Sequence, residues 1–264
     1  GSSKYAGIIR EAKSGNVENC VSEVTVSSSS FAGGIIGKKT GSQTVTVKGC
    51  TNTGAVKSSF SDNRSAGAGG IVGYSQTNIQ IFNSCNTGDV SAPNCAPTIN
   101  MYPIGAGGII GNGGGRDNVI ISCTNSGKVS STGYTGGITG NGGKIANCIN
   151  YGQITGGTFT GGISGGDWTS SGDGYVYIVN CFNIGSVTSN STDSGHGIGA
   201  LIGRMTCDGG WGQAIYIIKS FALSAFEGFF ALLFTFDDVL FKIDFVPLSC
   251  DFTDFGSVSF CFFC

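Results

Sequence analysis

The chain has 264 residues, of which 11% are charged, and its formal net charge is −2. With so few charges the chain has no basic stripe for a phosphate backbone, so we expect no nucleic acid as a partner. The 47 glycines of the chain follow no three-residue period, which excludes collagen. All glycines except Gly228 and Gly256 lie at or before Gly212, whereas 13 of the 18 phenylalanines lie between Phe221 and Phe263. We therefore expect two parts, residues 1–212 and 213–264.

The chain does not start with Met, and no charged and then apolar leader opens it. Such a start is typical of a segment cut from a longer precursor. We expect further repeats or domains of the same polypeptide.

Two landmarks alternate along residues 1–212, and an internal repeat of this kind determines the fold. The first landmark is a glycine-flanked aliphatic pair, which starts at Gly34, Gly70, Gly108, Gly137 and Gly162, with a variant at Ala200. The second is C-x-N-x-G-x-[VI], which starts at Cys50, Cys123, Cys148 and Cys181. Units of 25 to 38 residues, with the extra length confined to two points, predict a constant coil with loop insertions.

The cysteine position of the second landmark, here called the slot, also accepts serine. In chain order the slot holds Cys20, Cys50, Ser84, Cys123, Cys148, Cys181 and Ser220. The asparagine two positions later is Asn52, Asn86, Asn125, Asn150 or Asn183. In stacked coils these asparagines can form a continuous amide ladder, as in cross-β stacks.

An aliphatic residue stands three positions before every slot, and several copies add another five positions before it. This period of two predicts a strand with one buried face. The slot is out of phase with that face, so the chain must turn just before it. Asn19, Asn83, Asn147 and Asn180 stand at this turn, and asparagine tolerates the left-handed backbone conformation.

Three strands in about 25 residues, without a helical period, predict an all-β fold, a parallel β-helix of six to seven coils. At about 4.8 Å per coil, seven coils would form a rod about 34 Å long. The paired landmarks resemble GLUG-motif repeats over about residues 5 to 205, although Ile stands where the motif has Leu, except at Leu201. The resemblance implies a secreted or cell-surface, adhesin-like scaffold, and it supplies no catalytic residues.

The 11 cysteines raise the question of metal binding or disulfides. Cys261 and Cys264 form a lone C-x-x-C without a second pair, so we expect no metal site and no cofactor. Neighbouring coils bring slots close enough for a bridge. The serines at the slot favour reduced thiols over disulfides, while a bridge from Cys85 to Cys95 stays open for a secreted protein.

The insertions hold the candidate ligand-binding residues. Asp167, Trp168 and Asp173 share the loop "GDWTSSGDG", which could stack a sugar or bind Ca²⁺, and His196 follows in "DSGHGIG". The plainer interpretation is that these are solvated loop residues. Carbohydrate-cleaving β-helices need paired carboxylates on one face, and the acids here are scattered.

From about Ala214 the repeat pattern fades, and "FEGFFALLFTF" is shorter than the roughly 20 apolar residues of a membrane-spanning helix. The tail is open to three interpretations: a divergent C-terminal cap, a membrane anchor, or a mistranslated end. We place the cap first, because an open coil edge invites further pairing.

The leading hypothesis is a non-enzymatic, extracellular or cell-surface repeat module for adhesion or spacing. Its partners would be a host or cell-surface protein or glycan, and a membrane only if the tail is an anchor. The alternative is a polysaccharide-acting β-helix lyase or hydrolase with its site in the loops between Asp167 and His196.

Overall fold

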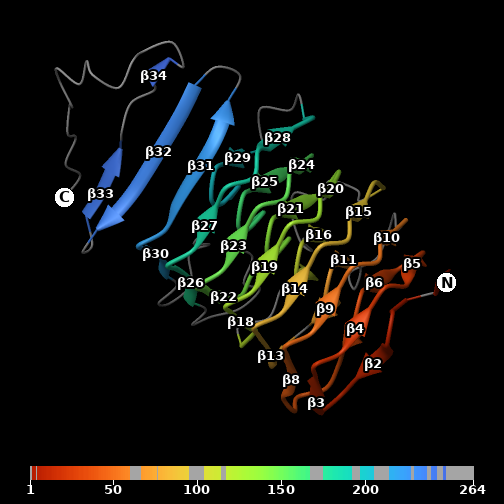
Figure 1. The fold of residues 1–264 in the computed structure, drawn as a ribbon. Coiled ribbons are helices and arrows are strands. Elements are labelled where there is room, and N and C mark those ends of the chain that lie inside the picture. The colour runs from red at the N-terminus through yellow and green to blue at the C-terminus, as the bar shows by residue number, and fades with distance from the viewer. Residues whose placement is uncertain are drawn as a thin grey trace.

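The computed structural model describes residues 2–3, 5–59, 67–75, 77–94, 104–113, 117–166, 175–191, 197–204, 214–226, 229–236, 239–242 and 246–247. The described residues form strands, turns and bends but no helix, and the strands stack as a parallel β-helix (Figure 1). The chain winds through five sheets, named A to E, and each complete coil adds one rung. The coil from Phe31 to Ser58, for example, visits sheets B, C, D, E and A in that order.

Sheets A and B each run along the rod with parallel neighbours. Sheet A contains β1 (Ser2–Ser3), β5 (Thr25–Ser28), β10 (Val56–Ser58), β15 (Val90–Ala92), β20 (Val129–Ser131), β24 (Ile154–Gly156) and β28 (Val187–Ser189). Sheet B contains β6 (Phe31–Gly33), β11 (Gly67–Gly69), β16 (Gly105–Gly107), β21 (Tyr134–Gly136), β25 (Phe159–Gly161) and β29 (Gly197–Gly199).

Sheets C and D follow sheet B in each coil. Sheet C contains β2 (Ile9–Ala12), β7 (Ile36–Lys39), β12 (Val72–Ser75) and β17 (Ile110–Asn112), and single bridges at Thr139, Ser164 and Ile202 continue it. Sheet D contains β3 (Gly15–Glu18), β8 (Val45–Lys48), β13 (Ile79–Phe82), β18 (Val119–Ile121), β22 (Lys144–Ala146), β26 (Tyr175–Val179) and β30 (Ala214–Ile218).

Sheet E carries the asparagine positions and the C-terminal strands. Its parallel strands are β4 (Val21–Ser22), β9 (Thr51–Asn52), β14 (Cys85–Asn86), β19 (Thr124–Asn125), β23 (Ile149–Asn150), β27 (Phe182–Asn183) and β31 (Phe221–Phe226). The parallel register continues to Ala222, which pairs with Asn183. The chain then reverses into antiparallel strands β32 (Phe229–Phe236), β33 (Val239–Lys242) and β34 (Val246–Pro247) at the far end of the rod (Figure 1).

The prediction of three strands per coil was too low, because two of the expected strands are bent and divided. The segment after the slot splits into a strand of sheet E and one of sheet A. At this bend the Asn52 side chain donates from Nδ2 to the carbonyl oxygen of Gly54 at 2.8 Å, which turns the backbone. The glycine-pair segment likewise splits, into β6 and β7 around Gly34 and Ile35.

The interior contains two apolar clusters that run along the rod. The aliphatic residues three positions before the slots lie in one of them, with the isoleucines of the glycine pairs, as at Val47, Ile81 and Ile36. The other cluster joins sheets A and B, for example through Val56 and Ala68. Burial of side chains with the same shape in every coil is what makes the sequence repeat.

Candidate functional site

The turn before the slot has the same backbone conformation in all seven copies. The residue there has a positive φ between 48° and 64° at Asn19, Gly49, Asn83, Ser122, Asn147, Asn180 and Lys219. The four asparagines predicted at this turn are thus in the left-handed region, where asparagine and glycine are favoured. Ser122 and Lys219 adopt it as well, so coil stacking overrides the local preference.

The slot side chain makes one hydrogen bond that is present in every copy. In each copy the thiol or hydroxyl donates to the carbonyl oxygen two residues earlier, at 2.9 to 3.5 Å, in Cys20, Cys50, Ser84, Cys123, Cys148, Cys181 and Ser220. A second contact links coils: the amide N–H of Cys50 donates to Ser84 Oγ at 3.2 Å, and that of Cys181 donates to Ser220 Oγ at 3.1 Å. The slot therefore needs a small side chain that carries a donor, which explains why cysteine and serine interchange.

The described cysteines are free thiols: Cys20, Cys50, Cys85, Cys123, Cys148 and Cys181. Cys85 lies outside the slot column and is partly exposed, while Ser84 takes the slot and is buried. Cys95, the other half of the bridge considered above, lies outside the described residues.

Two of the buried thiols, Cys50 and Cys148, are poorly suited to nucleophilic or ligand chemistry, whereas a hydrogen bond with Cys148 lowers the pKa of Cys123 and of Cys181. Hydrogen-bond contacts with Cys123 and Cys181, together with burial, raise the pKa of Cys148 well above its ordinary value. Burial also raises the pKa of the Cys50 thiol. Because the thiolate is the reactive form, protonated thiols sealed in a core are inert.

The asparagines of the second landmark form the ladder that the spacing predicts. Asn52, Asn86, Asn125, Asn150 and Asn183 are all fully buried. Each Nδ2 except the last donates to Oδ1 of the asparagine in the next coil at 2.8 Å. The same Nδ2 donates to the carbonyl oxygen two residues on, so both amide hydrogens are used in every coil. The last, Asn183, donates instead to the carbonyl oxygens of Gly185 and Ala200.

The two landmarks meet in the core, a relationship that the sequence analysis missed. A Cβ on Gly34, Gly70, Gly108, Gly137 or Gly162 would lie 2.2 to 2.3 Å from the Cγ or Nδ2 of the ladder asparagine in the same coil. The first glycine of the pair is therefore what leaves room for the amide. The available signal was that both landmarks occur once in every coil, because two positions that repeat together can be in contact even though their separation in the sequence varies.

A buried lysine is a second feature that the sequence analysis missed. Lys39 is fully buried at an inward position of sheet C, between Ala12 and Ser75 of the neighbouring coils, and its Nζ donates to the carbonyl oxygen of Gly41 at 2.5 Å. Burial lowers the pKa of Lys39. The signal in the sequence was that Lys39 aligns with small residues, Ala12 and Ser75, in the neighbouring coils.

The candidate ligand-binding residues Asp167, Trp168, Asp173 and His196 all lie outside the described residues. Within the described ranges, no three His, Cys, Asp or Glu side chains gather closely enough to hold a metal ion. The same ranges contain no helix of the length and apolarity needed to cross a membrane. Searches against protein-family models, curated proteins and solved structures find no match to this chain.

Proposed function

We propose that this chain is a non-enzymatic repeat module of the cell surface or the extracellular space, a rod that carries loops outward for adhesion. The observation that carries the proposal is the unbroken asparagine ladder, which joins five successive coils through buried side chains. Such an interior is a support rather than a cavity for a substrate. The resemblance to GLUG-motif repeats adds to the proposal.

The insertions enter the rod at two corners, which suits the display of loops. Between sheets A and B the connection is residues 157–158 in the shortest coil but residues 59–66 and 93–104 in two others. Between the strands of sheets C and D it ranges from residues 13–14 to residues 113–118. Because the strands on either side keep their register, the length of the connection varies without disturbing the core, and the insertions start from two rows of positions along the rod.

The strands after Ala222 support the hypothesis of a C-terminal cap. Parallel stacking in sheet E gives way there to the antiparallel pairing of β31 with β32. A strand that turns back covers the edge on which another coil would otherwise pair. We propose that residues 213–264 serve as this cap rather than as an anchor.

A binding screen with trimmed loops tests the proposal. Residues 59–66 and 93–104 would each be replaced by the two-residue connection Gly157-Thr158, which the shortest coil already uses. Intact and trimmed proteins would be applied to glycan arrays and to host-cell surfaces, with circular dichroism as the folding control. We expect the intact rod to bind and the trimmed rods to lose binding while staying folded.

A polysaccharide screen supplies the contrary outcome. Turnover of a polysaccharide that disappears in Asp167→Ala would show that the rod is a β-helix enzyme. Such a result would overturn the proposed scaffold.

A further inference from the structure

Sheets B and C meet along one side of the rod, at a junction here called the seam. The seam consists of the first residue of each sheet B strand, such as Phe31, and the third residue of each sheet C strand, such as Tyr74. These positions face each other, because a Cβ on Gly67 of β11 would lie 3.1 Å from the Cβ of Asn112 of β17. Phe31 and Tyr74 belong to neither apolar cluster of the interior, so the seam is a separate row of side chains along the rod.

Aromatic rings and cations alternate along the seam in the first three coils. The ring centroids of Tyr5 and Phe31 are 5.4 Å apart. Lys38 Nζ lies 5.8 Å from the centroid of the Phe31 ring and 5.5 Å from that of the Tyr74 ring. The guanidinium carbon of Arg10 lies 4.5 Å from the centroid of the Tyr5 ring. Contacts at these distances are cation–π interactions, so the five side chains form one continuous row.

Further along the rod the seam is closed by the chain itself. The rings of Tyr134 and Phe159 are stacked there, with centroids 5.0 Å apart. Arg204 covers them: its guanidinium carbon lies 4.7 Å from the Phe159 centroid, and its Nη1 donates to Tyr134 Oη at 3.0 Å. These two rings are only 3% and 6% exposed, whereas Phe31 and Tyr74 are partly exposed. The first three coils therefore present an open version of a closed arrangement.

The cations of the open stretch are available to an anionic ligand. Within the described part of the chain neither Lys38 nor Arg10 forms an ion pair, and the one salt bridge there joins Lys144 to Asp117. A ring is neutral, so a ring contact orients a cation without compensating its charge. Lys38 and Arg10 are thus held in place with their charges unpaired.

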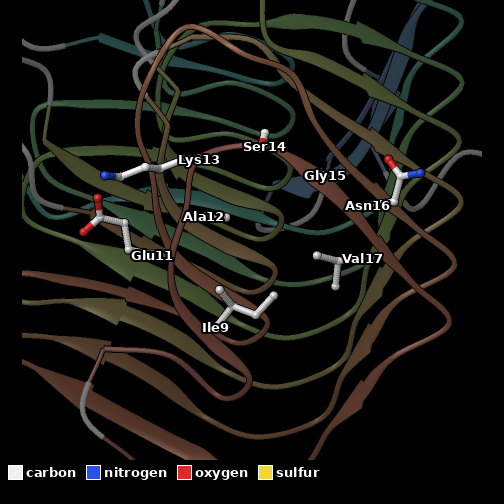
Figure 2. A pocket seen from close by; sticks show the side chains of 8 residues that line it. All are labelled: Ile9, Glu11, Ala12, Lys13, Ser14, Gly15, Asn16 and Val17. Carbon is white, nitrogen blue, oxygen red and sulfur yellow. The ribbon is translucent and has the colours of Figure 1, made fainter.

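One carboxylate lies among these cations and has to be counted. Glu11 is next to Lys38 in register, and Figure 2 shows it extending beside Lys13. Thr40 Oγ1 donates to Glu11 Oε1 at 2.7 Å, and this hydrogen bond lowers the pKa of the carboxyl group. The charges of Lys13, Lys38 and Arg10 lower that pKa further, so Glu11 is ionised at neutral pH. Three cations against one carboxylate leave a surplus of positive charge on this stretch.

From these observations we propose that the seam of the first three coils binds an extended acidic polysaccharide, one whose sugar rings carry carboxylate groups. Coils about 4.8 Å apart offer aromatic faces to successive sugars, because an extended polysaccharide advances by a similar length with each ring. Lys38 and Arg10 bind the carboxylates, and the guanidinium can do so with two parallel hydrogen bonds. A neutral polysaccharide would use the rings alone.

This binding surface lies on the body of the rod, so it goes beyond the display of loops proposed above. Lys38 on β7 and Tyr74 on β12 lie in strands that are paired on both sides. A further coil stacked on the first would therefore lengthen the row and leave these two residues uncovered.

Equilibrium binding to the full chain tests the proposal. The probes are polygalacturonate, which has a carboxylate on every sugar ring, and its methyl ester, which has the same rings without the charge. Calorimetric titration would give the Kd of the wild type for each. We expect the wild type to bind polygalacturonate, to bind the methyl ester roughly tenfold or more weakly, and to lose affinity for polygalacturonate as salt is added.

Two pairs of matched variants separate the seam from other surfaces. Lys38→Gln removes a charge and Tyr74→Leu removes a ring, and each is expected to weaken binding roughly fivefold or more. Lys57→Gln alters an exposed lysine of sheet A, and Tyr151→Leu alters a tyrosine next to β23 that is 50% exposed. Both controls are expected to keep the Kd within about twofold of the wild type, with circular dichroism as the folding control for all four.

A rod in which Gly157-Thr158 replaces residues 93–104 should bind polygalacturonate as tightly as the intact rod, and a loss of binding would place the ligand in the loops instead. Wild type that does not bind polygalacturonate at roughly 1 mM of sugar units would overturn the proposal, as would equal affinity for the methyl ester. Controls that weaken binding as much as the seam variants would overturn it too. Single-stranded DNA bound as tightly as polygalacturonate would show a general polyanion surface and so contradict the proposed ligand.

Discussion

Replacing Asn150 by leucine should damage the fold far more than replacing Cys148 by serine, although the two residues lie in the same corner of one coil. The Asn150 amide makes four hydrogen bonds: it donates to Gly152 and Asn183, and it accepts from Asn125 Nδ2 and from the Gly152 N–H, at 2.8 to 3.2 Å. Leucine has a similar volume but leaves these four buried groups without a partner.

The magnitude follows from the count of orphaned groups. At about 1 to 3 kcal/mol for each buried group left unsatisfied, the loss is about 4 kcal/mol or more. A whole domain is stable by only about 5 to 15 kcal/mol. We therefore expect Asn150→Leu to unfold its coil and the coils stacked on it, since a solenoid is held together by nearest-neighbour contacts.

Cys148→Ser retains the bonds of the slot, because Ser84 and Ser220 already make them in other coils. We expect it to change the stability by no more than about 1 kcal/mol. Asn52→Leu is a matched control at the end of the ladder, where Nδ2 makes two hydrogen bonds and Oδ1 makes none. Its loss should be about half that of Asn150→Leu.

Urea unfolding, combined with hydrogen exchange of the individual coils, would measure these differences. The expected order of stability is wild type and Cys148→Ser, then Asn52→Leu, then Asn150→Leu. If Asn150→Leu were as stable as Cys148→Ser, the ladder would not be the feature that holds the coils in register, and the reasoning would be wrong.

Three other predictions follow from the interior. Gly137→Ala should destabilise the protein by about 3 kcal/mol or more, because the new Cβ would lie 2.3 Å from Asn150 Cγ, and Asn150 is held in place by the ladder. Thermal unfolding would measure the loss, and a variant as stable as the wild type would contradict the close packing of the two landmarks. Burial lowers the folded-state pKa of Lys39, so the unfolded chain binds more protons and the free energy of unfolding should rise with pH towards the unfolded pKa. Unfolding curves measured at several pH values should show this rise for the wild type but not for Lys39→Met, and an equal rise in both would exclude Lys39 as the cause. Thiol titration without reductant should find at least the six described cysteines free after denaturation, and almost no free thiol would refute the unpaired slots. In the native protein Cys20 and Cys85 should react first among the six, because the other four are buried.

The sequence alone was sufficient for the stacked parallel fold, the left-handed turn and the asparagine ladder. Each of these depends on a residue that meets its own equivalent in the next coil, so the repeat displays it directly. Asn83, for example, stands one residue before the slot and has a φ of 49°, and Asn86 donates to Asn125 as its spacing predicts.

The tertiary structure decided what lies across the coil rather than along it. The packing of Gly137 on Asn150 joins segments that the repeat keeps apart, and only the path of the backbone brings them together. The number of strands per coil was decided in the same way, because a side-chain hydrogen bond such as that from Asn52 to Gly54 bends a segment whose alternation suggests one straight strand. Periodicity in a sequence specifies which residues face inward, but contacts inside a coil depend on its cross-section, which periodicity does not encode.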